Sequence, residues 1–113
     1  MRDYSLYIKD ILYCMGKIEE FVGDMTYDEF VADDKTSSAV IHKIEIIGEA
    51  AKNVPKDIRT KYKHIPWSDM ARTRDKIIHF YFGVDYEIVW KVVKENLPAL
   101  KNKIEAILKE LNP

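Results

Sequence analysis

The sequence predicts an all-α protein, built as a bundle of four main helices with short extra helices. Apolar residues recur at steps of three and four over long stretches, which is the spacing of one face of a helix. Strand-like alternation of apolar and polar residues is nowhere sustained. Only four Gly and four Pro interrupt the 113 residues, so few breaks divide the predicted helices.

The first segment predicts a long amphipathic helix that ends at Gly23-Asp24. Residues 26–29, Thr-Tyr-Asp-Glu, have the form of a capping box, which predicts a short helix through Ala32. The stripe of the long helix that we expect to be buried consists of Tyr4, Ile8, Ile11, Met15, Ile18 and Val22.

The pair Asp33-Asp34 predicts the cap of a second long helix, and Asn53-Val54-Pro55 predicts its end. Gly48 and Ala50-Ala51 are small, so another helix could approach closely there. Pro55 suits the first turn of a further short helix, which we expect to reach about Tyr62. The expected buried stripe of the long helix is Val40, Ile44, Ile47 and Ala51.

The C-terminal part predicts two more helical regions. One is expected over about 67–82, from Trp67 to Phe82, with Gly83 as its terminator. Asp85 is expected to cap the other region. Pro98 has no backbone N–H donor, so it should kink or break that region, which then resumes to about residue 111.

The chain length fits a single domain, residues 1–113, and its charge is unevenly distributed. A formal net charge of −1 argues against a general nucleic-acid binder. Residues 1–50 hold 5 Lys/Arg and 11 Asp/Glu, whereas residues 51–76 hold 8 basic and 3 acidic residues. The basic segment is either a solvated helical face or a local surface that attracts phosphate.

Several kinds of site are excluded by what the sequence lacks. Cys14 is the only cysteine, so no intrachain disulfide or thiolate metal cluster can form. The three histidines show no metal-ligand spacing, and no Gly-rich phosphate loop occurs, so we expect no metal and no cofactor. Neither a signal peptide nor a membrane-spanning run is present, which predicts a cytoplasmic protein.

The segment 73–81 combines residues that could perform chemistry. On a continuous helix, Arg74 and Tyr81 share one stripe, and Asp75 and His79, four residues apart, can interact directly. Arg74 and His79 diverge by roughly 140° in that geometry. One helix therefore does not bring those two groups together unless the long arginine bends toward His79 or a second protomer presents its own copy opposite.

These residue types suit the cleavage of a phosphodiester. Histidine can take or give a proton near neutral pH, and arginine can hold a phosphate and stabilise the charge of the transition state. RNA supplies its own nucleophile, the 2′-hydroxyl, so no metal-bound water is required. Asp75 could orient His79 and keep it partly protonated. The alternative is that Arg74, Asp75 and His79 are ordinary polar residues on the surface of a helix.

The motif Arg74-Asp75-x-x-x-His79 resembles the Arg-polar-x-x-x-His signature of HEPN domains. With Tyr81 it resembles the extended motif of the HepT branch of that superfamily. In many HEPN members the residue after the arginine is Asn, whereas this chain has Asp75. Its carboxylate would disfavour the binding of an RNA phosphate. Further segments similar in order and spacing are Arg2-Asp-Tyr4, Ile8–Ile11, Ile46–Ala50, Ile65–Trp67, Trp90 and Asn96–Pro98.

The resemblance implies an HEPN-type helical bundle that forms a homodimer, with the two motifs facing each other across a cleft. It implies a metal-independent endoribonuclease toxin, with Arg74, His79 and the supporting Asp75 as catalytic residues, that leaves a cyclic phosphate. It also implies an MntA-like minimal nucleotidyltransferase as the antitoxin, which silences the toxin by adding AMP to Tyr81.

Two other interpretations remain open on the sequence. The chain could be a non-catalytic subunit that engages a nucleotidyltransferase and presents Tyr81 or a nucleotide pocket to it, which suits the acidic N-terminal half. It could also be a purely structural helical dimerisation module, in which the polar residues of the motif would be dispensable.

Overall fold

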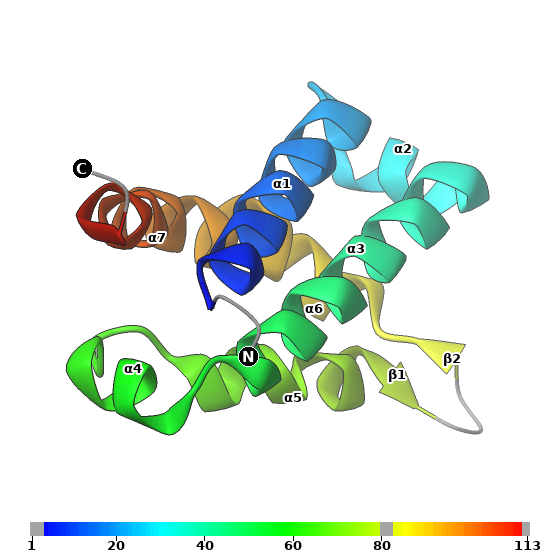
Figure 1. Cartoon of the computed structure of the whole chain (residues 1–113). Coiled ribbons are helices and arrows are strands. Elements are labelled where there is room, and N and C mark those ends of the chain that lie inside the picture. The colour runs from blue at the N-terminus through cyan, green and yellow to red at the C-terminus, as the bar shows by residue number, and fades with distance from the viewer. Residues whose placement is uncertain (1–3, 80–82, 112–113) are drawn as a thin grey trace.

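The computed structural model describes residues 4–79 and 83–111 of the chain. Almost all of these residues are helical, and one small hairpin interrupts the helices, so the predicted all-α bundle is confirmed (Figure 1). The elements in chain order are α1 (Ser5–Val22), α2 (Tyr27–Ala32), α3 (Asp34–Asn53), α4 (Lys56–Lys61), α5 (Trp67–Ile77), β1 (Ile78–His79), β2 (Gly83–Val84), α6 (Tyr86–Lys91), the π-helical turn Val92–Asn96 and α7 (Leu97–Leu111).

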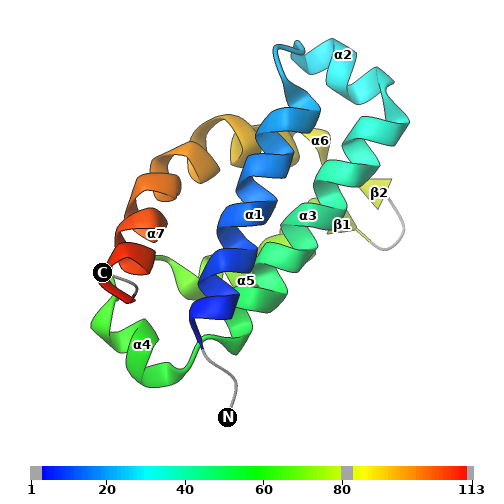
Figure 2. The same cartoon turned by 45° about the horizontal axis from the view of Figure 1, so that its top comes forward.

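The four main helices α1, α3, α5 and α7 pack around one core. Helix α1 lies between α3 and α7, and α5 packs on the other side of α3 (Figure 2). The stripes predicted for α1 and α3 are buried except for Tyr4, which is half-buried and precedes α1, and Ile8, Ile11 and Val40 have no exposed surface. Cys14 and Trp67 are also buried and belong to the core. No helix among the described residues is long and apolar enough to span a membrane.

Local side chains fix where the helices begin, as the sequence predicts. Thr26 and Glu29 form both hydrogen bonds of the capping box at the start of α2. The carboxylate of Asp33 accepts from the backbone N–H and the hydroxyl of Thr36, and these two hydrogen bonds hold the pKa of Asp33 below its ordinary value. Asp85 caps α6 by accepting from the N–H of Ile88.

Helices α3 and α5 approach each other closely at Gly48. A Cβ atom added to this glycine would lie 3.0 Å from the backbone oxygen of Met70, closer than a side chain can normally sit. The expected close approach of a second helix is therefore confirmed, and that helix is α5. This contact positions α5, the helix that carries the first residues of the candidate motif.

Replacing Gly48 with Val is expected to lower the free energy of unfolding by about 1–3 kcal/mol, because the added atoms would force α3 and α5 apart. Gly16 provides the matched control, since a Cβ atom added there meets no described atom within 4 Å. Gly16→Ala should stabilise the protein by about 0.5–1 kcal/mol, because Ala restricts the unfolded chain and favours the helix. Urea unfolding of both variants measures these effects; equal changes of the same sign would contradict the assigned packing.

The last helical region is interrupted one turn before Pro98. The residues Val92–Asn96 form a π-helical turn, in which the N–H of Leu97 donates to the carbonyl of Val92. A proline offers no N–H to the preceding turn, and a π turn is a common site for such a change of register. The interruption that the sequence predicts is thus confirmed, and α7 continues to Leu111.

The prediction of one helix over 67–82 is wrong at its C-terminal end. Helix α5 ends at Ile77, and Ile78 has the extended dihedral angles φ −112° and ψ 116°. The chain then forms an antiparallel pair in which Ile78 lies opposite Val84 and His79 opposite Gly83. The β-branched and aromatic residues of 77–82 favour extended backbone, and Gly83 with φ +80° allows the return strand.

Candidate active site

Arg74 lies in the last turn of α5 and reaches across to α3. Its Nε atom is 3.2 Å from Oε2 of Glu45, and the side chains are 56% and 37% exposed respectively. The guanidinium is therefore held at the surface where an incoming phosphate can reach it. An exposed ion pair of this kind contributes little to stability, so a phosphate can compete with Glu45 for the guanidinium.

No pattern in the sequence indicates Glu45 as part of the site. It lies in α3 beside the buried stripe, 29 residues before Arg74, and only the pairing of α3 with α5 brings them together. The small residues around Gly48 signalled a close helix contact but did not say which helix would make it. Glu45 could not be predicted because the sequence does not show that α5 is the helix that packs against α3.

Asp75 is also exposed in the last turn of α5, and within the described residues it forms no ion pair. Its predicted contact with His79 assumed a helix that continues through both residues. The helix ends between them, at Ile77, so that geometric argument no longer applies. The predicted divergence of roughly 140° between Arg74 and His79 does not apply either, because it assumed a helical turn of about 100° per residue through both residues.

His79 lies in β1, where its backbone pairs with Gly83 of β2. Arg74 and His79 are therefore placed by different elements, one by a helix and the other by a hairpin, at the same end of α5. Tyr81 lies outside the residues that the structure describes. Its predicted role stays a prediction.

A buried side chain and a backbone hydrogen bond fix the base of the hairpin. Ile77 is completely buried, and its carbonyl accepts a hydrogen bond of 2.7 Å from the N–H of Asp85. The same Asp85 begins α6, so one residue closes the hairpin and caps the following helix. This arrangement fixes the junction between the helix that carries Arg74 and the strand that carries His79.

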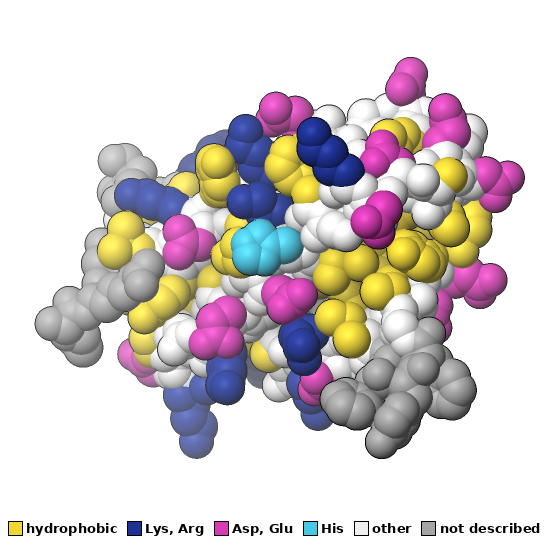
Figure 3. Space-filling model, turned by 90° about the vertical axis from the view of Figure 1, so that its right-hand side faces the viewer, with side chains coloured by type: hydrophobic (Ala, Val, Ile, Leu, Met, Phe, Trp, Pro, Cys, Tyr) yellow, Lys and Arg dark blue, Asp and Glu magenta, His cyan; other side chains and the backbone are white. Residues whose placement is uncertain are grey.

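The surface that carries the hairpin has mixed character. Figure 3 shows hydrophobic, acidic and basic side chains next to one another on this face, with no uniform basic patch. On α5, Arg72 and Lys76 are exposed, and both lie near Asp69, at 3.7 Å and 3.8 Å. Any attraction for a polyanion on this face therefore depends on individual cations such as Arg74.

No cluster of three or more His, Cys, Asp or Glu side chains that could hold a metal ion occurs within residues 4–79 and 83–111, as far as these are described. His42 and His64 are both exposed, His42 on α3 and His64 in the connection between α4 and α5. They lie in different elements from Arg74 and His79.

Comparisons with known proteins give consistent matches. The profile of the ribonuclease HepT-like family matches residues 11–107. A Thermococcus cleftensis protein named "Probable ribonuclease HepT" is 48% identical over 108 residues, which cover 96% of this chain and 98% of that protein. A Methanocaldococcus jannaschii protein named as a candidate RNase is 48% identical over 110 residues, which cover 97% of this chain and 91% of that protein. No solved structure gives a significant match.

The family match and the relatives agree with the resemblance seen in the motif around Arg74 and His79. The match extends from α1 to α7, so it covers the core and the motif together. The chain therefore belongs to the ribonuclease HepT-like family of the HEPN superfamily.

Proposed function

We propose that this protein is a metal-independent endoribonuclease toxin of a toxin–antitoxin system, with Arg74 and His79 as its catalytic residues. The observation that carries the proposal is the exposed guanidinium of Arg74 at the same end of α5 as His79, in a chain of the ribonuclease HepT-like family. The relatives named as ribonucleases support the same activity for this chain.

In the proposed reaction, His79 accepts the proton of the 2′-hydroxyl while O2′ attacks the adjacent phosphorus. The bond from phosphorus to O5′ breaks, and the leaving oxygen takes a proton, so the products are a 2′,3′-cyclic phosphate and a 5′-hydroxyl. Arg74 binds the non-bridging oxygens and stabilises their charge as the transition state forms. In this step Arg74 leaves Glu45, with which it forms a hydrogen bond in the free protein.

We further propose that the active unit is a homodimer. Two copies of the motif would then provide two histidines, one to accept the proton from the 2′-hydroxyl and one to protonate the leaving oxygen. Asp75, exposed beside Arg74, is proposed to support the histidine and to limit how strongly the site attracts phosphate.

A partner of the MntA-like minimal nucleotidyltransferase class is proposed as the antitoxin. The phenol oxygen of Tyr81 would attack the α-phosphorus of ATP, form a tyrosine–AMP phosphodiester, lose its proton and release pyrophosphate. The attached nucleotide would lie two residues from His79 in sequence and present its own phosphate to the cations of the site. This modification would block access of RNA.

Tyr81→Phe removes the acceptor oxygen, so the variant is expected to cut RNA but to resist silencing. Incubation with the nucleotidyltransferase and ATP should add 329 Da, or a multiple of it, to the parent and nothing to the variant, as intact-mass spectrometry can measure. Tyr86→Phe, on α6, is the matched control and should be modified like the parent. Equal modification of Tyr81→Phe and the parent would contradict the assignment.

The proposed activity is tested with the purified protein and RNA, in the absence of its partner and in the presence of a chelator. Cleavage that survives chelation supports the endoribonuclease. The second candidate function, a non-catalytic subunit that binds a nucleotidyltransferase, predicts a tight complex and no cleavage. The acidic N-terminal half of the chain favours that candidate, because it offers a surface for a protein partner more readily than for RNA.

A further inference from the structure

A polar pocket lies at the opposite end of α5 from Arg74. Its volume is about 490 Å³, and it is formed by α4, the following connection and the first turn of α5. The floor includes Trp67, which is buried and donates from Nε1 to the carbonyl of Tyr62. The residues that line the pocket are Lys56, Arg59, Thr60, Lys63, Ile65, Pro66, Trp67, Ser68 and Asp69.

The pocket contains three cations and one carboxylate. Within the described residues, none of Lys56, Arg59 and Lys63 takes part in an ion pair. The one carboxylate, Asp69, lies near Arg72 and Lys76 outside the pocket. The pocket therefore has an excess of positive charge that the described part of the protein does not neutralise.

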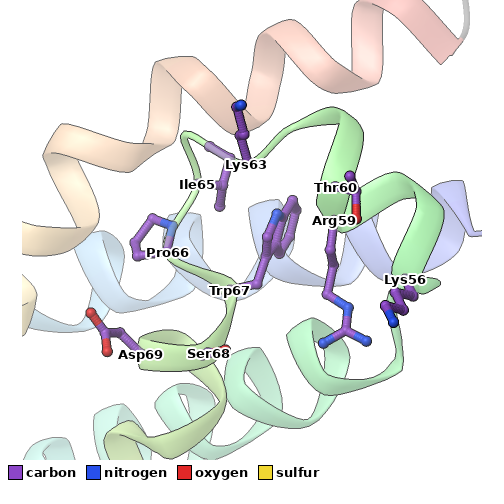
Figure 4. A pocket seen from close by; sticks show the side chains of 9 residues that line it. All are labelled: Lys56, Arg59, Thr60, Lys63, Ile65, Pro66, Trp67, Ser68 and Asp69. Atoms are coloured by element: carbon purple, nitrogen blue, oxygen red, sulfur yellow. The ribbon is translucent and has the colours of Figure 1, made fainter.

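Arg59 is half-buried at the pocket, and one of its donors is unsatisfied. Its Nε atom is buried and has no hydrogen-bond partner within the described residues. A buried donor without an acceptor is unfavourable, and the penalty is larger for a charged group. Figure 4 shows Arg59 and Lys56 extending toward the same region of the pocket, whereas Lys63 points away from them.

The start of α5 adds donors to the same pocket. The 11-residue helix has Pro66 as its N-cap, and no side chain caps this end. The N–H groups of a first helical turn have no acceptor within the helix, so those of Ser68 and Asp69 are available to a ligand. Free N–H groups together with the helix dipole favour an anion, and phosphate is a frequent ligand of such ends.

The position of the pocket relates it to the candidate active site. Figure 1 shows α4, α5 and the hairpin in one row along an edge of the molecule. Trp67 and Arg74 are seven residues apart on the same helix, which corresponds to about 10 Å along its axis. Helix α4 and most of α5 belong to the basic segment of the sequence, 51–76, and a single strand of RNA is long enough to contact both ends of α5.

We propose that the pocket formed by Lys56, Arg59 and the start of α5 binds a phosphodiester of the RNA strand away from the scissile bond. The inference rests on the proposed ribonuclease function, since it assumes that the same strand reaches Arg74. A bound phosphate would accept from the guanidinium of Arg59 and from the first amides of α5. It would fix the register in which the strand lies along α5.

Binding of a 2′-O-methyl RNA 12-mer, which cannot be cut by 2′-hydroxyl attack, tests this proposal by fluorescence anisotropy. Lys56→Gln and Arg59→Gln together should raise the Kd about tenfold or more, because hydrogen bonds from charged groups are lost. The slope of log K against log salt concentration should become shallower by about 0.7 for one phosphate. Lys61→Gln, on the same helix but outside the pocket, is the matched control and should bind like the parent.

Lys56→Gln alone, at an exposed position, provides a variant whose folding is not in question and should raise the Kd in the same direction. An unchanged Kd in the double variant, or an equal rise in Kd in Lys61→Gln, would contradict RNA binding at the pocket. Binding of AMP or inorganic phosphate as tight as that of the RNA, with the same dependence on Arg59, would overturn the assignment to an RNA strand.

The two proposals fail in different ways. If the parent binds the 12-mer through Arg59 but does not cut an unmodified RNA, the result supports RNA binding at the pocket and contradicts the ribonuclease function. If the parent cuts RNA while the double variant binds and cuts like the parent, the result supports the ribonuclease function and contradicts RNA binding at the pocket. An RNA dinucleotide is too short to span α5, so its cleavage should be the same in the parent and the double variant.

Discussion

Arg74→Ala is expected to lower kcat for RNA cleavage by about 10²–10³-fold, the usual effect of removing one group that stabilises transition-state charge. His79→Ala should have at least as large an effect, because it removes the proposed proton-transfer group. Arg74 is exposed and is bonded only to Glu45 among the described residues, so its replacement should leave the fold intact. Steady-state cleavage of a labelled RNA measures kcat, and circular dichroism checks the helices.

The matched control is Arg72→Ala on the same helix. Arg72 is 67% exposed, against 56% for Arg74, and it lies near Asp69 and not Glu45. Its replacement should leave kcat unchanged. Equal activity of Arg74→Ala, His79→Ala and the parent would show that the catalytic roles are wrongly assigned.

The second large effect is expected at Ile77, whose replacement with Ala should lower the free energy of unfolding by about 2–5 kcal/mol. The side chain is completely buried where α5 ends and the hairpin begins. Loss of this anchor leaves a cavity beneath the junction between Arg74 and His79. Denaturant unfolding measures the change in stability.

Lys76→Ala provides the control for Ile77→Ala, since Lys76 is the neighbouring residue but is exposed. It should change stability by no more than about 0.5 kcal/mol. The cleavage rate of Ile77→Ala should also fall at a temperature where the variant is still folded, because the hairpin that carries His79 is less firmly fixed. A stable and fully active Ile77→Ala would contradict the role of this junction.

The helical framework could be predicted because its signals are local. Capping residues such as Thr26 and Asp33, and the stop at Pro55, determine the helix boundaries within a few residues of themselves. The stripes of α1 and α3 repeat over several turns, which leaves little ambiguity in the type of element. These features agree between sequence and structure.

The hairpin could not be predicted in the same way. The run 77–82 is short and largely apolar apart from His79, and such a run suits a strand as well as the end of a helix. Gly83 is compatible with both, because it can terminate a helix or open a return strand. The outcome is decided by tertiary contacts, in particular the burial of Ile77 and the hydrogen bond from Asp85.

For the candidate site, the sequence indicated which residues to consider but not how they are arranged in space. Arg74 and Asp75 are exposed at the end of α5, where a ligand can reach them. The position of His79 relative to Arg74 and Asp75 differs from the prediction, because His79 belongs to a strand and not to the same helix. Glu45 and the pocket around Arg59 depend on contacts between separate helices, which no local pattern reveals.

The most direct test of the proposed ribonuclease uses an RNA in which one nucleotide at a mapped cleavage position carries 2′-deoxyribose. In the presence of a chelator, the purified protein should cut the unmodified RNA and leave a 2′,3′-cyclic phosphate. It should not cut after the deoxynucleotide. Cutting at the deoxy position, or cutting that requires an added divalent metal ion, would contradict attack by the 2′-hydroxyl at a site made of Arg74 and His79.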